Sequence, residues 1–183
     1  MKILAIAGSN SDTSINKQLV TYAASLFEHA EIETVDMNDF EMPLYKHQRE
    51  VESGVPQQAV DLASKIDGAH VLLVALSEHN GTYSAAFKNV FDWTSRIKNR
   101  AVWNEVPMLL MATAPGGRGG LGVLEAAEKR FPLHGGNIVG TFSLPFFNDN
   151  FDKENQKISN EEKDNELKEL VQKISAVESI LEK

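Results

Sequence analysis

The residues that could do chemistry lie in three short segments, and the first, residues 8–16, has the sequence GSNSDTSIN. It follows an apolar run and precedes a helical pattern, so its backbone N–H groups and the helix dipole can attract an anion. No Gly-Lys-Ser/Thr follows at the spacing of a Walker loop. The segment predicts a neutral phosphate cradle or, alternatively, a serine-rich helix cap. The side chains that can donate to a phosphate are Ser9, Ser11, Ser14 and Asn16.

The second segment, residues 77–83, has the sequence SEHNGTY and follows another apolar run. Glu78 and His79 suggest acid–base chemistry, but no Gly-x-Ser-x-Gly motif accompanies them, and adjacent side chains after a strand tend to diverge. Asn80 and Gly81 form a turn signal. We favour a strand-to-helix turn whose backbone N–H and C=O groups bind the rim of a flat polar heterocycle.

The third segment, residues 114–120, has the sequence APGGRGG. Residues 117–122 match the dinucleotide pattern G-x-G-x-x-G, between a strand and a helix. However, the match follows the fourth predicted strand instead of the first, and GTFS at residues 140–143 stands where an acidic residue is expected. We therefore expect a loop whose glycines let a flat ligand approach the backbone, or else a flexible glycine-rich turn.

Strand-like apolar runs alternate with helical patterns along the chain, which indicates an α/β fold with a parallel sheet. The predicted strands are residues 2–7, 31–36, 70–75, 107–113 and 137–143. The predicted helices are residues 15–27, 57–66, 84–97, 121–131 and a last one that opens with a capping box at 159–162 and carries an apolar stripe from Leu167 to Val177 and Leu181. Five strands in this alternation predict a flavodoxin-like three-layer sandwich, with strand order 2-1-3-4-5 and helices on both faces. Two long loops, residues 37–56 and 144–159, interrupt the alternation.

The predicted helix at residues 84–97 carries three aromatic residues that could be mistaken for a site. Phe87 and Phe91 fall at helical spacing with other apolar residues, so we expect them in the core. Trp93 is a candidate for contact with a partner subunit.

Length and composition limit the class of protein. The 183 residues fit one domain, and a net charge of −8 without a basic cluster argues against a nucleic-acid partner. No apolar run is long enough for a membrane span, and no signal region opens the chain, so we expect no membrane partner. The absence of cysteine excludes disulfides and thiolate catalysis and fits a cytoplasmic protein. The histidines show no metal-ligand spacing, so no metal is expected.

Taken together, the three segments resemble the NADPH-dependent FMN reductase family, which includes quinone, chromate and azo-dye reductases of flavodoxin-like fold. The family pattern Gly-Ser-x-Arg-x-x-Ser-x-Asn is matched at Gly8, Ser9, Ser14 and Asn16. The family pattern Pro-Glu-Tyr-Asn is matched at Glu78 and Asn80, followed by the helix motif FKNVFDW at residues 87–93. Residues 115–120 match the family's glycine-rich loop, and residues 42–45 resemble its loop after the second strand.

The sequence departs from the family at three positions. Ser11 stands where the arginine usually is, and Ser77 and His79 replace the proline and the tyrosine. Without the arginine, one charge-assisted phosphate contact is lost, so we expect FMN to bind more weakly or more exchangeably than in typical relatives.

The resemblance implies an enzyme that passes hydride from NADPH or NADH through bound FMN to a small acceptor, such as a quinone, an azo dye, a metal oxyanion or free flavin. The flavin carries the chemistry, so no catalytic acid or base is expected. The whole chain, residues 1–183, would be one FMN-binding domain in a homodimer or homotetramer. A flavodoxin-type electron-transfer protein, or a relative with weakened or lost flavin binding, remains the alternative. The implied cofactor-binding residues are Ser9, Ser11, Ser14, Ile15 and Asn16 at the phosphate, Ser77, Glu78, His79, Asn80 and Gly81 at the ring edge, and Pro115, Gly116, Gly117 and Arg118 on its far side.

Overall fold

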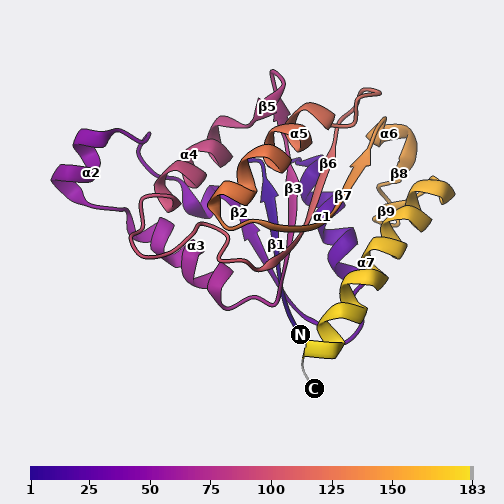
Figure 1. Cartoon of the computed structure of the whole chain (residues 1–183). Coiled ribbons are helices and arrows are strands. Elements are labelled where there is room, and N and C mark those ends of the chain that lie inside the picture. The colour runs from indigo at the N-terminus through magenta and orange to yellow at the C-terminus, as the bar shows by residue number, and fades with distance from the viewer. Residues whose placement is uncertain (182–183) are drawn as a thin grey trace.

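A five-stranded parallel sheet forms the centre of the structure (Figure 1), a computed structural model that describes the backbone of residues 1–181 and the side chains of residues 1–176. The strand order is β2-β1-β3-β6-β7, which confirms the predicted order 2-1-3-4-5. The strands of this sheet are β1 (Lys2–Gly8), β2 (Glu31–Asp36), β3 (Val71–Leu76), β6 (Pro107–Thr113) and β7 (Asn137–Leu144).

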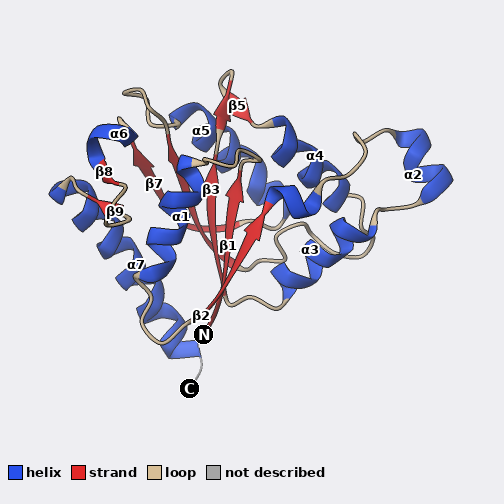
Figure 2. Cartoon of the chain, turned by 180° about the vertical axis from the view of Figure 1, so that it is seen from behind, coloured by secondary structure: helices blue, strands red, loops and turns tan. Residues whose placement is uncertain are grey.

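Helices cover both faces of the sheet, as predicted (Figure 2). Helices α1 (Ile15–Ser25) and α7 (Glu161–Leu181) pack on one face, and α3 (Gln57–Asp67), α4 (Ala85–Thr94) and α5 (Leu121–Arg130) pack on the other. Every residue of β3 is buried, and its side chains alternate between the two cores: Leu72 and Val74 face one, Leu73 and Ala75 the other. A strand buried on both faces reads as a continuous apolar run, which is why the sequence pattern located it.

The two segments expected to be loops contain short elements. Residues 37–56 include the 3-10 helix η1 (Met37–Phe40) and helix α2 (His47–Ser53), and residues 144–159 include α6 (Phe147–Asn150) and the hairpin β8 (Phe151–Asp152) and β9 (Lys157–Ile158). The two segments interrupt the alternation as predicted, but they carry short helices and strands that were not predicted. Helix α2 buries none of its residues and projects from the body of the molecule (Figure 1), so it has no apolar stripe that a sequence pattern could detect.

Several helix ends differ from the prediction, and α3 ends one residue later than predicted. Helix α1 ends at Ser25, and the N–H groups of Leu26 and Phe27 bond three residues back. Helix α4 ends at Thr94, and the N–H groups of Arg96 and Ile97 do the same, so each helix closes with a tighter turn. Helix α5 ends at Arg130 and is followed by the 3-10 helix η2 (Phe131–His134). The cap of α7 is Asn160, whose Oδ1 accepts from the Lys163 N–H at 3.1 Å, so the predicted cap at 159 was one residue early. The side chains of Val177 and Leu181 in the predicted stripe lie outside the described residues.

Trp93 lies inside its own chain, and the expectation that it faces a partner subunit was wrong. Its side chain is 1% exposed, and its Nε1–H donates to the carbonyl of Pro43 at 2.7 Å. Tyr45 packs edge-on against its ring, with centroids 5.0 Å apart. Trp93 therefore fixes the segment before α2, whereas Phe87 and Phe91 are buried in the core as predicted. No helix within residues 1–181 is long and apolar enough to cross a membrane.

Candidate functional site

The three chemistry-bearing segments meet at one edge of the sheet. The parallel register places Gly8 beside Leu76 and Leu76 beside Ala112, so the loops that follow β1, β3 and β6 begin side by side. A cavity of about 230 Å³ lies between these loops. Its lining residues are Ser9, Ser11, Thr13, Ser14, Ile15, Asn16, Ser77, Glu78, His79, Thr113, Ala114 and Pro115.

The first loop forms a cradle of hydroxyl groups at the N-terminus of α1. The Ser14 hydroxyl caps the helix by accepting from a backbone N–H at 3.1 Å, as the helix-cap interpretation predicts. The hydroxyls of Ser9 and Ser11 each accept from a backbone N–H two residues ahead, at 3.2 Å and 3.3 Å. The Ser9 hydroxyl keeps its own hydrogen to donate, and the Ser11 hydroxyl shares a 3.5 Å hydrogen bond with the Thr13 hydroxyl, in which either can be the donor. Within residues 1–181, the N–H groups of Ile15 and Asn16 have no hydrogen-bond partner. Because both the cap and free donors are present, the loop can also hold an anion.

Asn16 ties the three loops together. Its side chain is 3% exposed, its Oδ1 accepts from the Thr113 N–H at 3.0 Å, and its Nδ2 donates to the Thr113 carbonyl at 3.2 Å. The same Nδ2 donates to the Ser77 hydroxyl at 3.4 Å. Both amide hydrogens are therefore engaged inside the protein. The sequence suggested a phosphate donor here, and the structure shows a residue that positions the cavity walls.

Glu78 and His79 belong to a small hairpin. Strands β4 (Glu78–His79) and β5 (Thr82–Tyr83) pair across a turn in which Asn80 has φ 53° and Gly81 has φ 81°, the positive angles of a type I′ turn. The Glu78 carboxylate accepts from the Val123 N–H at 3.1 Å and so stabilises the N-terminus of α5. Because neighbouring strand residues point to opposite faces, the two side chains diverge. An acid–base pair between them has no geometric support.

The glycine-rich third loop is shaped by close packing at its end. Gly120 has φ 81°, and a Cβ at this position would lie 2.6 Å from the Cβ of Ala112, so only glycine fits there. A Cβ at Gly116, in contrast, would meet no atom within 4 Å. This part of the loop is open to an approaching ligand. The three glycines of the G-x-G-x-x-G match are closely packed instead: a Cβ at Gly117, Gly119 or Gly122 would lie within 3.0 Å of Phe146, Ser143 or Glu78 respectively.

The predicted site residues divide into two sets. Those that line the cavity are Ser9, Ser11, Ser14, Ile15, Asn16, Ser77, Glu78, His79 and Pro115. Those that lie outside its lining are Asn80, Gly81, Gly116, Gly117 and Arg118. The sequence reasoning missed Thr13, Thr113 and Ala114, although Thr113 stands at the last position of a predicted strand, where a parallel sheet presents residues to its ligand edge.

The cavity holds no lysine or arginine among its lining residues. The nearest cation in the sequence, Lys17, pairs with Asp36 at 2.5 Å, and its hydrogen bond lowers the pKa of that carboxyl. An anion in the cradle would therefore be held by neutral hydroxyls, backbone N–H groups and the helix dipole.

Comparisons with known proteins agree with this architecture. An uncharacterized protein of Mycoplasma pneumoniae is 28% identical over 156 residues, which cover 82% of this chain and 91% of that one. The NADPH:quinone oxidoreductase of Arabidopsis thaliana is 32% identical over 124 residues, which cover 66% of this chain and 61% of the plant enzyme. The match thus spans less than two thirds of the plant enzyme's length.

A solved structure shares the fold over nearly its whole length. The flavoenzyme NAD(P)H:(acceptor) oxidoreductase FerB from Paracoccus denitrificans superposes with a TM-score of 0.76 at 20% identity, covering 94% of each chain. The model of the family described as NADPH-dependent FMN reductase matches residues 1–150, which contain the whole sheet and all three loops. The chain belongs to the NADPH-dependent FMN reductase family.

Proposed function

We propose that the chain binds FMN in the cavity between the three loops, reduces it with NADPH or NADH, and passes the electrons to a small acceptor such as a quinone, an azo dye, a metal oxyanion or free flavin. The observation that carries the proposal is the pair of unpartnered N–H groups at Ile15 and Asn16, which face an anion-binding position beside donor hydroxyls. The family and the quinone oxidoreductase among the relatives support this class of reaction.

The residues present fit the cofactor. The hydroxyls of Ser9 and Ser11 and the two free N–H groups would hold the phosphate, and the hairpin at residues 77–83 would present its backbone to the ring edge. The open side of Gly116 leaves room for a flat ring system. When bound, FMN supplies the redox chemistry. The chain orients it, and no side chain in the cavity is assigned a proton-transfer role.

Ser11 makes the proposed binding weaker than in relatives that carry an arginine at this position. A charge-assisted hydrogen bond contributes about 1.5–3 kcal/mol, which corresponds to about one to two decades in affinity. An exchangeable flavin follows from this substitution. We also propose that residues 1–183 form one FMN-binding domain, that the protein is cytoplasmic, and that it assembles as a homodimer or homotetramer.

Titration of the protein with FMN, followed by flavin fluorescence, tests the cofactor. The most informative variant is Ile15→Pro, which removes the backbone N–H of residue 15. Residue 15 is the first residue of α1, a position where proline is tolerated. We expect FMN affinity to fall about tenfold to a hundredfold, because one hydrogen bond to a charged phosphate is lost. Ile15→Ala shortens the side chain but keeps the N–H, so it is the matched control. Riboflavin, which lacks the phosphate, should bind both variants alike.

Anaerobic addition of NADPH or NADH to the FMN-loaded protein then tests the reaction. We expect the oxidised flavin absorbance to bleach and to return when a quinone is added. FMN binding without bleaching by either dinucleotide would indicate a flavodoxin-type electron carrier instead. A protein that quenches no FMN fluorescence would overturn the proposal.

A further inference from the structure

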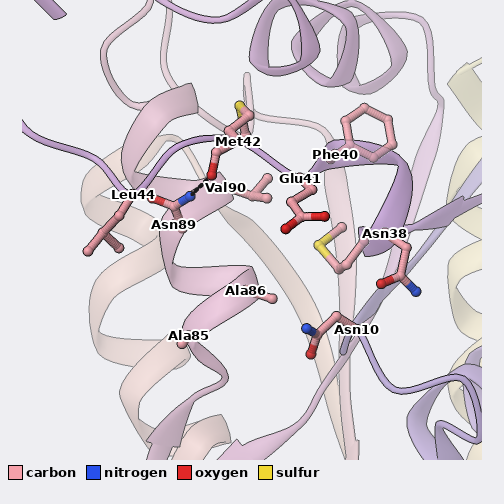
Figure 3. A pocket seen from close by; sticks show the side chains of 11 residues that line it. Asn10, Asn38, Phe40, Glu41, Met42, Leu44, Ala85, Ala86, Asn89 and Val90 are labelled. Atoms are coloured by element: carbon pink, nitrogen blue, oxygen red, sulfur yellow. Dashed lines mark hydrogen bonds between the residues drawn. The ribbon is translucent and has the colours of Figure 1, made fainter. Parts of the chain in front are cut away.

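A second pocket, of about 260 Å³, lies on the other side of the loop after β1 (Figure 3). It is formed by this loop, by η1 with the segment that follows it, and by the start of α4. Asn10 lines this pocket, whereas its neighbours Ser9 and Ser11 line the candidate flavin cavity, so one loop is the wall between the two. The lining residues of the second pocket are Asn10, Met37, Asn38, Phe40, Glu41, Met42, Leu44, Ala85, Ala86, Asn89 and Val90.

The outer wall of this pocket is held in place by hydrogen bonds. Asn89 on α4 donates from Nδ2 to the Met42 carbonyl at 3.0 Å and accepts at Oδ1 from the Tyr45 N–H at 2.8 Å. Trp93 fixes the intervening Pro43 through its indole N–H. Since α4 and the segment at residues 42–45 are tied at these points, the pocket is preformed.

Two polar side chains in the pocket are free to bind a ligand. Figure 3 shows the carboxylate of Glu41 and the carboxamide of Asn10 among the side chains that line the pocket, each on a separate segment of the chain. Neither side chain makes a hydrogen bond or ion pair within the described residues. The rest of the wall is largely apolar, with Phe40 and Met42 buried. No lining residue is lysine, arginine or histidine.

This chemistry favours a neutral, hydroxyl-bearing ligand and disfavours an anion. An unpaired carboxylate is an acceptor for hydroxyl groups, as where an acidic residue binds the ribose 2′-OH of NAD in dinucleotide-binding folds. A phosphate at the same place would meet the carboxylate's charge, with no cation in the wall and a net charge of −8 on the chain. Arg118, the cation that could meet a 2′-phosphate, lies outside this lining on the loop after β6.

We infer that this pocket takes the adenosine ribose of NADH, with Glu41 accepting from its hydroxyls, and that it selects NADH over NADPH. The inference rests on the proposed function, because it places the adenosine end of the same NADH molecule whose nicotinamide would reduce the flavin on the other side of the loop after β1. It names NADH as the preferred reductant, which the family name alone does not.

Calorimetric titration of the FMN-loaded protein with 5′-AMP and with adenosine 2′,5′-bisphosphate tests the pocket without any redox step. We expect 5′-AMP to bind at least tenfold more tightly than the bisphosphate, since only the latter places a phosphate beside Glu41. In Glu41→Gln the two affinities should converge to within about threefold, because the repulsion is removed. Glu31→Gln is the matched control, since it makes the same charge change on an exposed residue at the start of β2. The ratio of kcat/KM for NADH to that for NADPH should fall in Glu41→Gln and stay constant in Glu31→Gln.

The outcomes separate this inference from the proposed function. If both dinucleotides bleach the flavin but Glu41→Gln changes neither the affinity ratio nor the kcat/KM ratio, the pocket inference is overturned and the function stands. The inference also fails if 5′-AMP does not bind. If neither dinucleotide bleaches the flavin, the proposed function fails, while dependence of 5′-AMP binding on Glu41 still supports a nucleoside site.

Discussion

Replacing Ser11 by arginine should tighten FMN binding. Ser11 is exposed on the cradle, and its only side-chain hydrogen bond to the backbone is accepted from the Thr13 N–H at 3.3 Å. Water can take over that bond, so its loss contributes little. The Ser11 carbonyl keeps its bond from the Ser14 N–H at 3.1 Å in the variant, because the backbone is unchanged.

The gain comes from one charge-assisted contact with the phosphate. Such a contact contributes about 1.5–3 kcal/mol where it is well formed, and solvent at this exposed position favours the lower end. We therefore expect the FMN dissociation constant of Ser11→Arg to fall about tenfold at low salt. The gain in affinity should be smaller at about 0.5 M salt, because dissolved ions then screen the attraction between the arginine and the phosphate.

Fluorescence titration measures the effect, with two controls. Ser11→Gln adds a long polar side chain without charge, and riboflavin lacks the phosphate. The reasoning is refuted if Ser11→Arg leaves the FMN dissociation constant unchanged, or if riboflavin gains as much affinity as FMN. An equal gain in Ser11→Gln would show that length and not charge is responsible.

Three further predictions concern stability. Asn16→Ala should lower the free energy of unfolding by about 1–3 kcal/mol in urea titrations and also weaken FMN binding, because buried backbone groups of Thr113 lose their partner; unchanged values of both would contradict the bridging role. Glu78→Gln should cost about 0.5–1 kcal/mol of unfolding free energy at low salt and less at high salt, since the side chain keeps its shape but loses its charge at the N-terminus of α5. Burial, together with the nearby charge of Arg130, lowers the pKa of His134 in the folded protein. As the pH falls, His134 is therefore protonated more readily in the unfolded state than in the folded state. Stability should therefore fall as pH drops through about 6.5 towards the folded pKa, and His134→Gln should flatten that slope in urea titrations from pH 7.5 to 5; an equal slope in the variant would show that other groups cause it.

The apolar patterns predicted the sheet correctly, because each strand is marked by its own run of apolar residues. The six residues of β3 are apolar in sequence and buried in space, and the polar segments follow their strands at predictable positions. Parallel connections then require the three loops to share an edge, so most of the cavity lining followed from the sequence.

The remaining features of the site depend on contacts between residues that are far apart in the sequence, which a local pattern does not reveal. Asn16 looked like a phosphate donor, but its partner Thr113 is 97 positions away. Trp93 looked available for a subunit contact, but the Pro43 carbonyl, 50 positions earlier, accepts its N–H. The pocket at Glu41 was not predicted, because its walls come from three separate segments that meet only in the folded chain.

The Asn16 bridge also bears on the order in which the site is made during synthesis. The cradle is complete in sequence by the first turn of α1, but its anchor on β6 is translated 97 residues later. At about 5–20 residues per second, this delay is about 5–20 s. During that interval the nascent chain contains the first loop, but the side-chain amide of Asn16 lacks its hydrogen-bond partner Thr113. Stable binding of the proposed flavin would therefore follow the docking of β6. A nascent chain that stops before Thr113 has the first loop without the hydrogen bonds that hold Asn16 in place.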